Sequence, residues 1–135
     1  MLALDPGDVR TGVAVSDELG LLAHPRPAII GGGVRGLVAA VTRIVEEDGI
    51  GEVIVGLPLS MSGAFTDQTI RARKIADTLS GGLKVRVSTF DERLTTVQAR
   101  RSKRGKVRRD GTLDSAAATI LLQAVIDKRN GGISS

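Results

Sequence analysis

The chain of 135 residues contains no cysteine, tyrosine or tryptophan, and it has only one histidine and two phenylalanines. Without cysteine it can form no disulfide, thiolate nucleophile or cysteine zinc site. The single histidine, His24, lies in the proline-rich segment AHPRP, which predicts a bend, so we interpret it as structural and not as part of a Ser-His-Asp arrangement. Carboxylates, hydroxyls and a metal ion are what remain for catalysis.

Two further absences concern the compartment. No apolar run approaches the roughly 20 residues that a membrane helix needs. No charged-then-apolar leader with a small-residue cleavage site is visible. Together with the lack of cysteine, these observations favour a cytoplasmic protein with no membrane partner.

Basic charge is concentrated in one short segment. The net charge is +4, but residues 100–109, RRSKRGKVRR, hold seven basic residues and no acid. They are Arg100, Arg101, Lys103, Arg104, Lys106, Arg108 and Arg109. A block of like charge repels itself unless a polyanion balances it, so we interpret it as a phosphate-binding patch. The alternative is a solvated loop without a partner.

The scarcity of aromatic residues limits how a nucleic acid would be recognised. Only Phe65 and Phe90 are present, and we assign Phe90 to the core. A surface that grips single strands by stacking bases is therefore not expected. Recognition should depend on shape, charge and the context of the substrate.

The hydrophobic pattern predicts a single α/β domain spanning residues 1–135. The expected strands cover residues 2–5, 11–15, 27–30, 52–58 and 84–90, and the expected helices cover 37–48, 70–79 and 113–125, with another beginning over 95–101. The turn DPGDVR predicts an antiparallel hairpin, and Gly31–Gly33 form a linker. We expect a mixed five-stranded sheet with helices on both faces, a mobile basic loop at about 100–112 and a flexible tail at about 130–135.

Three acids stand out by their position. Asp5 ends the first strand, Glu92 follows the last strand and Asp114 opens the last helix. Ligands of open α/β sheets collect beyond the carboxyl ends of the strands, so a shared site is geometrically feasible. Each acid also has a local alternative: a turn cap for Asp5, an ion pair with Arg93 for Glu92, and a helix-dipole role for Asp114.

Carboxylates that are brought together repel one another and raise each other's pKa unless a cation neutralises them. Mg²⁺ and Mn²⁺ prefer such hard oxygen ligands. Two such ions can activate a water and stabilise the leaving oxygen of a phosphodiester without histidine, cysteine or tyrosine. This chemistry agrees with the composition.

Four segments, LALDPGDVRTGVAVSD, VGLPLSMSG, DERLTTVQAR and LDSAAATILLQ, resemble in order the sequence blocks of the YqgF/RuvX family. The resemblance spans nearly the whole chain and implies an RNase H-like fold related to the RuvC resolvases. Members of this family are described as pre-16S ribosomal RNA nucleases, and earlier as Holliday junction resolvases. The resemblance thus implies a metal-dependent nuclease that acts on pre-16S rRNA, in the context of the ribosomal particle.

By this resemblance, Asp5, Glu92 and Asp114 bind two Mg²⁺ or Mn²⁺ ions and are catalytic, while Arg10 and Arg93 join the basic segment in binding substrate phosphates. The chain departs from the family at Pro6, Asp8 and Ser60, which stand where other residue types are common. Asp91 precedes Glu92, and strand alternation points the two to opposite sides, so we assign Glu92 to the site.

Two alternatives stay open. A junction resolvase would use the same acids on branched DNA and would need a symmetric homodimer to cut two strands. A non-catalytic nucleic-acid or ribosome-binding module would need none of the acids, and the presence of all three argues against it.

Overall fold

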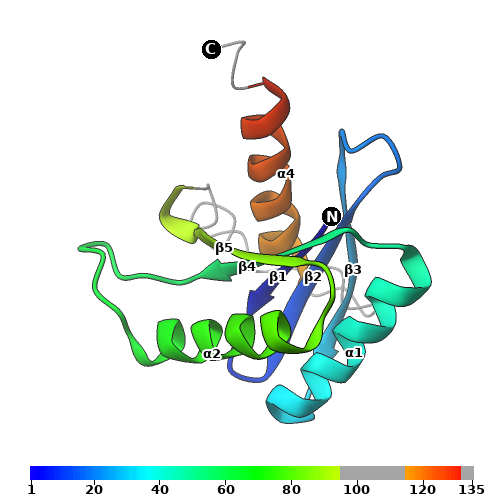
Figure 1. Cartoon of the computed structure of the whole chain (residues 1–135). Helices are drawn as coiled ribbons and strands as arrows, with labels where there is room; N and C mark the ends of the chain where they lie inside the picture. Colours follow the sequence, from blue (N-terminus) through cyan, green and yellow to red (C-terminus); the bar gives the residue numbers. More distant parts are fainter. Residues whose placement is uncertain (95–114, 132–135) are drawn as a thin grey trace.

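A computed structural model describes residues 1–94 and 115–131, and its centre is a five-stranded sheet (Figure 1). The strands are β1 (Leu2–Pro6), β2 (Arg10–Ser16), β3 (Ala23–Ile30), β4 (Glu52–Leu57) and β5 (Arg86–Asp91), and their spatial order is β3-β2-β1-β4-β5. The first three strands pair antiparallel, whereas β1, β4 and β5 pair in parallel. The predicted mixed five-stranded sheet is confirmed.

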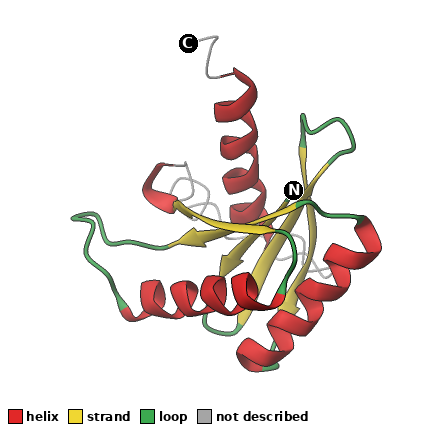
Figure 2. Ribbon diagram, viewed as in Figure 1, coloured by secondary structure: helices red, strands yellow, loops and turns green. Residues whose placement is uncertain are grey.

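Helices cover both faces of this sheet, as the sequence predicts (Figure 2). They are α1 (Gly33–Asp48), α2 (Asp67–Gly82) and α4 (Ala116–Gly131), with a short 3-10 turn at Glu92–Leu94. Leu2 and Leu4 of β1 pack into the core beneath α1 and α2, whereas Ala3 between them packs against α4. No helix in residues 1–94 and 115–131 is long and apolar enough to cross a bilayer.

The third strand differs from the prediction. It begins at Ala23 and includes His24, which pairs with Val15 of β2, so the bend expected at the prolines is wrong. Proline is tolerated here because β3 is an edge strand, where a missing N–H need not leave a ladder partner unsatisfied. The pairing of β2 and β3 also shifts register between Thr11 and Val13, the mark of a β-bulge.

The buried face of the last helix is shifted by one residue from the predicted one. Ala117, Leu121 and Val125 are buried as expected. The other predicted members Ala116, Ile120 and Ala124 are half-buried, and Ala118, Leu122 and Ile126 are buried in their place. The small residues at 117 and 118 let the start of α4 approach the sheet closely.

Several expectations fall on residues that the structure does not describe. The helix predicted to begin at residue 95, the basic loop at about 100–112 and residues 132–135 of the expected tail lie outside the described residues. Residues 130 and 131 of that tail belong to α4.

An ion pair ties the last turn of α4 to the sheet. Arg129 donates from Nη1 to Oε1 of Glu52 at 2.6 Å and from Nη2 to Oε2 at 2.8 Å. Glu52 opens β4, and its Oε2 also accepts from the Ser88 hydroxyl of β5 at 3.3 Å. One carboxylate therefore joins α4 and two strands at the end of the sheet where β4 begins.

We expect the Glu52→Gln variant to lose less stability on acidification than the natural chain. The hydrogen bonds from Arg129 lower the pKa of Glu52 below the ordinary glutamate value, so its stabilising contribution is present above that value and is lost as pH falls through the folded-state pKa. Urea unfolding from about pH 7 to about pH 3 measures the free energy of unfolding. The difference in free energy of unfolding between the natural chain and Glu52→Gln should become smaller as pH falls. A constant gap, or equal narrowing in the control Glu47→Gln at the exposed end of α1, contradicts the assignment.

Candidate functional site

Asp5 lies near the carboxyl end of the central strand β1, between two glycines. Alternation along β1 puts its side chain on the face that α4 covers. Gly12 of β2 is its paired residue. The parallel register of β1 with β4 ends at Leu4 opposite Val55, so the next residue of β4, Gly56, follows on the other side of Asp5. Because glycine has no side chain, neither flanking position places a side chain of its own beside Asp5.

Glu92 reaches the same place from the end of β5. It is 7% exposed, and both of its carboxylate oxygens are buried. A Cβ placed on Gly56 would lie 3.1 Å from Cγ of Glu92, 3.2 Å from its Cδ and 3.1 Å from Cδ2 of Leu121 in α4. The glutamate side chain thus occupies the space above Gly56, between the sheet and α4.

Glu92 therefore lies above Gly56, and Asp5 lies on the neighbouring strand β1 with its side chain on the same face of the sheet. Adjacent strands lie only about 4.8 Å apart. Burial of a carboxylate is costly unless positive charge or hydrogen-bond donors compensate it. A divalent cation with hard oxygen ligands fits this donor set. Within residues 1–94 and 115–131 no three potential ligands are grouped, and the third predicted acid, Asp114, lies outside the described residues.

The residue after Asp114 is fastened to the sheet beside this site. The buried Ser115 hydroxyl accepts a hydrogen bond from the Val13 N–H at 2.9 Å and donates to the Arg26 carbonyl at 2.5 Å. It thereby fills the interruption that the bulge makes between β2 and β3. Since Val13 lies on the strand next to β1, α4 starts one strand away from Asp5.

Arg93 is held by Asp91. Its Nε donates to the two carboxylate oxygens at 3.1 and 3.0 Å, and its Nη2 donates to Oδ2 at 2.7 Å. This hydrogen bonding lowers the pKa of Asp91 and raises the pKa of Arg93. Nη1 reaches the Met61 carbonyl at 3.4 Å and packs against Gly63. The arginine thus links the end of β5 to the loop after β4.

A second arginine supports the turn that follows Asp5. Arg71 of α2 donates to the Gly7 carbonyl. Gly7 N–H donates to the Arg10 carbonyl at 2.8 Å, and a Cβ at Gly7 would lie 2.7 Å from that oxygen, so only glycine fits. Arg10 itself is exposed at the start of β2, on the α4 face by strand alternation.

The remaining predicted positions divide into two groups. Asp8 is exposed in the β1–β2 turn, and the Ser60 hydroxyl accepts from Ala64 N–H at 3.0 Å within the loop after β4. The seven basic residues Arg100, Arg101, Lys103, Arg104, Lys106, Arg108 and Arg109 lie outside the described residues.

Sequence reasoning missed Gly56 and Ser115. A glycine inside the apolar strand EVIVGL signals that another group approaches the backbone closely, so Gly56 was recognisable in principle. No comparable signal marks Ser115, because its partners are 102 and 89 residues away in the sequence.

The family model described as RuvX, Holliday junction resolvase, matches residues 1–128. The chain belongs to the RuvX family. Its relatives include proteins named "Putative pre-16S rRNA nuclease" from Chloroflexus aurantiacus, 39% identical over 133 residues, and from Pelotomaculum thermopropionicum, 34% identical over 134 residues. Each alignment covers 96% of this chain and 87% of the relative.

The RuvX fold is also that of RuvC. The structure of T. thermophilus RuvC in complex with a Holliday junction substrate superposes with a TM-score of 0.58 at 15% identity, covering 97% of this chain and 96% of RuvC. A second Thermus thermophilus RuvC structure gives 0.56 at the same identity. The RNase H-like fold implied by the sequence is confirmed.

We expect Ser115→Ala to lower the free energy of unfolding by about 1–3 kcal/mol, because it leaves a buried N–H and a carbonyl without their hydroxyl partner. Urea denaturation measures the change. The control is Ser80→Ala on the exposed side of α2, which should stay within about 0.5 kcal/mol of the natural chain. Equal stability of both variants would show that the hydroxyl is not a structural link.

Proposed function

We propose that this RuvX protein is a divalent-metal-dependent nuclease that hydrolyses phosphodiester bonds, with precursor 16S ribosomal RNA as its substrate. The observation that carries the proposal is the buried carboxylate of Glu92 above Gly56, next to the strand that carries Asp5 on the same face of the sheet. The curated relatives named "Putative pre-16S rRNA nuclease" support the choice of RNA. We expect it to act in the cytoplasm, on ribosomal particles.

In this proposal Asp5, Glu92 and Asp114 hold two Mg²⁺ or Mn²⁺ ions. When bound, such ions supply a water nucleophile at neutral pH and stabilise the leaving oxygen. The chain's own contribution is orientation and shielding. Gly56 leaves room for the Glu92 side chain, and Leu121 of α4 packs beside it and shields its buried side from water.

Substrate phosphates would be bound by Arg10 at the rim and by the seven basic residues of segment 100–109. These contacts position a polynucleotide without selecting its sequence. Arg93 is engaged with Asp91 and Met61, so its role in the proposal is to keep the loop after β4 beside the site. If Arg93 also contacted a substrate phosphate, it would have to do so while keeping its hydrogen bonds to Asp91 and Met61.

A second candidate is a Holliday junction resolvase. It is favoured by the description of the RuvX family as Holliday junction resolvases and by the RuvC structure solved with a junction. The same acids would act in this case, but cleavage of two strands at symmetric positions would require a homodimer with two-fold symmetry.

Cleavage assays with a 16S precursor fragment and a four-way DNA junction, each with Mg²⁺ or Mn²⁺, test both candidates. Asp5→Asn and Glu92→Gln should each reduce cleavage by at least about a hundredfold, since even groups that merely orient metal ligands cost up to about that much. The exposed Glu47→Gln serves as the matched control and should cleave normally.

Cleavage that Asp5→Asn leaves unchanged would refute the proposed site. Symmetric cleavage of the junction alone would favour the resolvase. Binding of either substrate without cleavage would favour the non-catalytic module.

Gly56→Ala should impair cleavage much more than Gly51→Ala. The added methyl at position 56 would press on the Glu92 side chain at 3.1 Å, whereas a methyl at position 51 meets nothing within 4 Å. Gly56 lies inside β4 and Gly51 directly precedes it, so both variants make the same glycine-to-alanine change in one segment of the chain. Thermal unfolding checks that both fold, and equal cleavage by the two would show that the space above Gly56 is not needed.

A further inference from the structure

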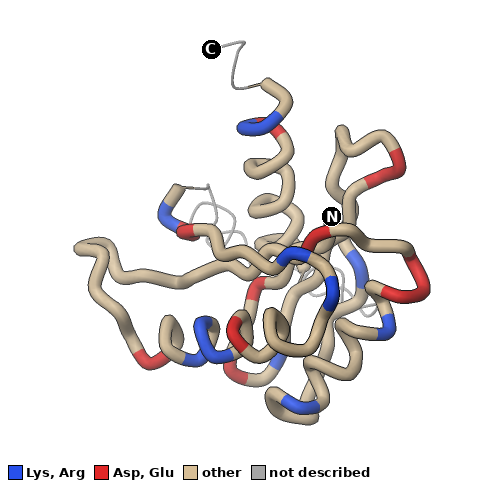
Figure 3. The backbone as a smooth tube through the Cα atoms, in the orientation of Figure 1, with Lys and Arg blue, Asp and Glu red and all other residues tan. Residues whose placement is uncertain are grey.

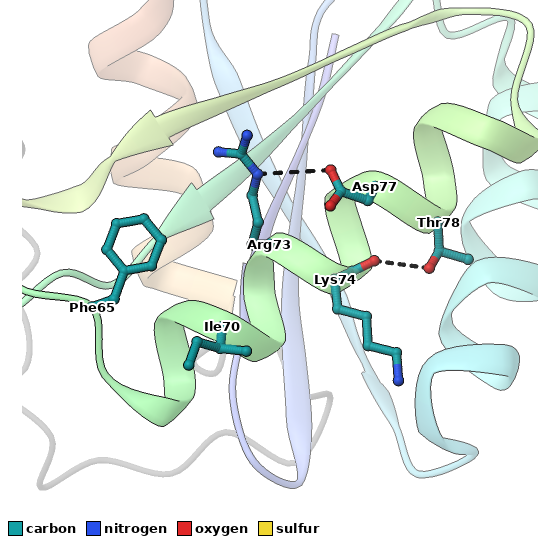
Figure 4. A pocket seen from close by; sticks show the side chains of 6 residues that line it. All are labelled: Phe65, Ile70, Arg73, Lys74, Asp77 and Thr78. Carbon is teal, nitrogen blue, oxygen red and sulfur yellow. Dashed lines mark hydrogen bonds and ion pairs between the residues drawn. The ribbon is translucent and has the colours of Figure 1, made fainter.

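A pocket of about 310 Å³ lies along the outer side of α2 (Figure 4). It is lined by Phe65, Ile70, Arg73, Lys74, Asp77 and Thr78, and we call it the α2 pocket. Phe65 and Ile70 are each 59% exposed. Of the two aromatic residues in the chain, Phe90 packs against the core, which leaves Phe65 as the exposed one.

The α2 pocket is joined to the end of the sheet that carries Glu92. Phe65 lies in the loop after β4, whose start is tied down by the Thr69 hydroxyl, which donates to the Pro58 carbonyl at 2.6 Å. The middle of the same loop accepts a hydrogen bond from Arg93, the residue after Glu92, at the Met61 carbonyl. The aromatic ring is therefore on a loop anchored beside the candidate site.

The side chains that line the α2 pocket carry a net positive charge, and the ion pair among them is weak enough for another anion to compete. Arg73 and Lys74 provide two cations against the single carboxylate of Asp77, and basic positions lie along the same helix (Figure 3). The ion pair between Arg73 Nε and Asp77 Oδ1 is long, 3.7 Å, with both side chains more than half exposed. Exposed pairs of this kind are weak, so a stronger anion can compete for the arginine.

We propose that the α2 pocket binds one unpaired nucleotide of the polynucleotide, with its base stacked on Phe65 and a phosphate beside Arg73 and Lys74. The inference rests on the proposed nucleic-acid substrate and adds a contact outside the catalytic acids. A pocket lined by one aromatic ring and two cations matches a nucleotide within a strand, because every base has a stacking face and the phosphates on both sides of it carry charge. An apolar protein segment would use the ring but leave both cations without a partner.

The proposal is compatible with the scarcity of aromatic residues. A row of stacked bases would need several rings, and the chain supplies one. The structure therefore assigns to Phe65 a single anchoring base, while shape and charge hold the rest of the strand.

Tryptophan substitution gives a direct test, because the natural chain has no tryptophan. Phe65→Trp places the sole tryptophan in the α2 pocket, and Leu19→Trp places it in the β2–β3 turn, where Leu19 is 81% exposed. Each variant is titrated with a short single-stranded RNA and the matching DNA in EDTA, so that cleavage does not interfere. We expect either oligonucleotide to quench the tryptophan at position 65 and to leave that at position 19 unchanged.

Affinity measured by fluorescence anisotropy provides the second readout. Phe65→Ala should weaken binding by about 5- to 150-fold, the range expected from loss of one stacked base, and Phe65→Trp should preserve it. Lys74→Ala should reduce the dependence of log affinity on log salt by about 0.7, the value for one phosphate contact on a single strand. The exposed Arg43→Ala on α1 is the matched control and should not change that slope.

The outcomes separate the two proposals. If the natural chain cleaves or binds its substrate while Phe65→Ala binds equally well and position 65 is not quenched, the α2 pocket inference is overturned and the nuclease proposal stands. If the natural chain neither binds nor cleaves any nucleic acid tested, the proposed function fails and the inference falls with it. Circular dichroism confirms that each variant is folded.

Discussion

The constraint on which the structure depends is the placement of the Glu92 carboxylate between the sheet and α4, next to the strand that carries Asp5. A charged group in such a position is costly, so its neighbours must give it both space and compensation. Glycines supply the space on the strands that flank Asp5. Leu121 of α4 then packs next to Glu92 above Gly56, which makes the glutamate a buried residue and not a surface one.

The helix that covers these acids is held by polar links at both ends. At its start, the Ser115 hydroxyl replaces a missing step in the β2–β3 ladder. At its end, Arg129 binds Glu52 with two hydrogen bonds. Apolar packing is non-directional. The directional hydrogen bonds at the two ends of α4 therefore help to set its position relative to Asp5.

Around the site, arginines connect loops to the sheet. Arg93 joins β5 to the loop after β4, and Arg71 joins α2 to the turn after β1. The two loops follow the carboxyl ends of β1 and β4, which are neighbouring parallel strands. Arg93, which the sequence pattern marks as a phosphate ligand, thus uses its hydrogen bonds within the protein.

The sequence by itself determined the elements whose signal is local. Alternation and apolar runs placed the strands of the mixed sheet, and the positions of Asp5 and Glu92 after strand ends identified acids that the topology brings to one edge. The chain's family also followed from its ordered motifs. These features were predictable because side-chain period and strand ends depend on residues close together in the chain.

Only the tertiary structure decided the features that depend on distant residues. The extension of β3 through its prolines required an edge position in the sheet, and the partner of Arg93 required the backbone to turn after Asp91. The link through Ser115 joins residues about a hundred positions apart, and the exposure of Phe65 depends on how the loop after β4 is tied down. Contacts of this kind arise from the packing of whole elements, so no short window of sequence contains them.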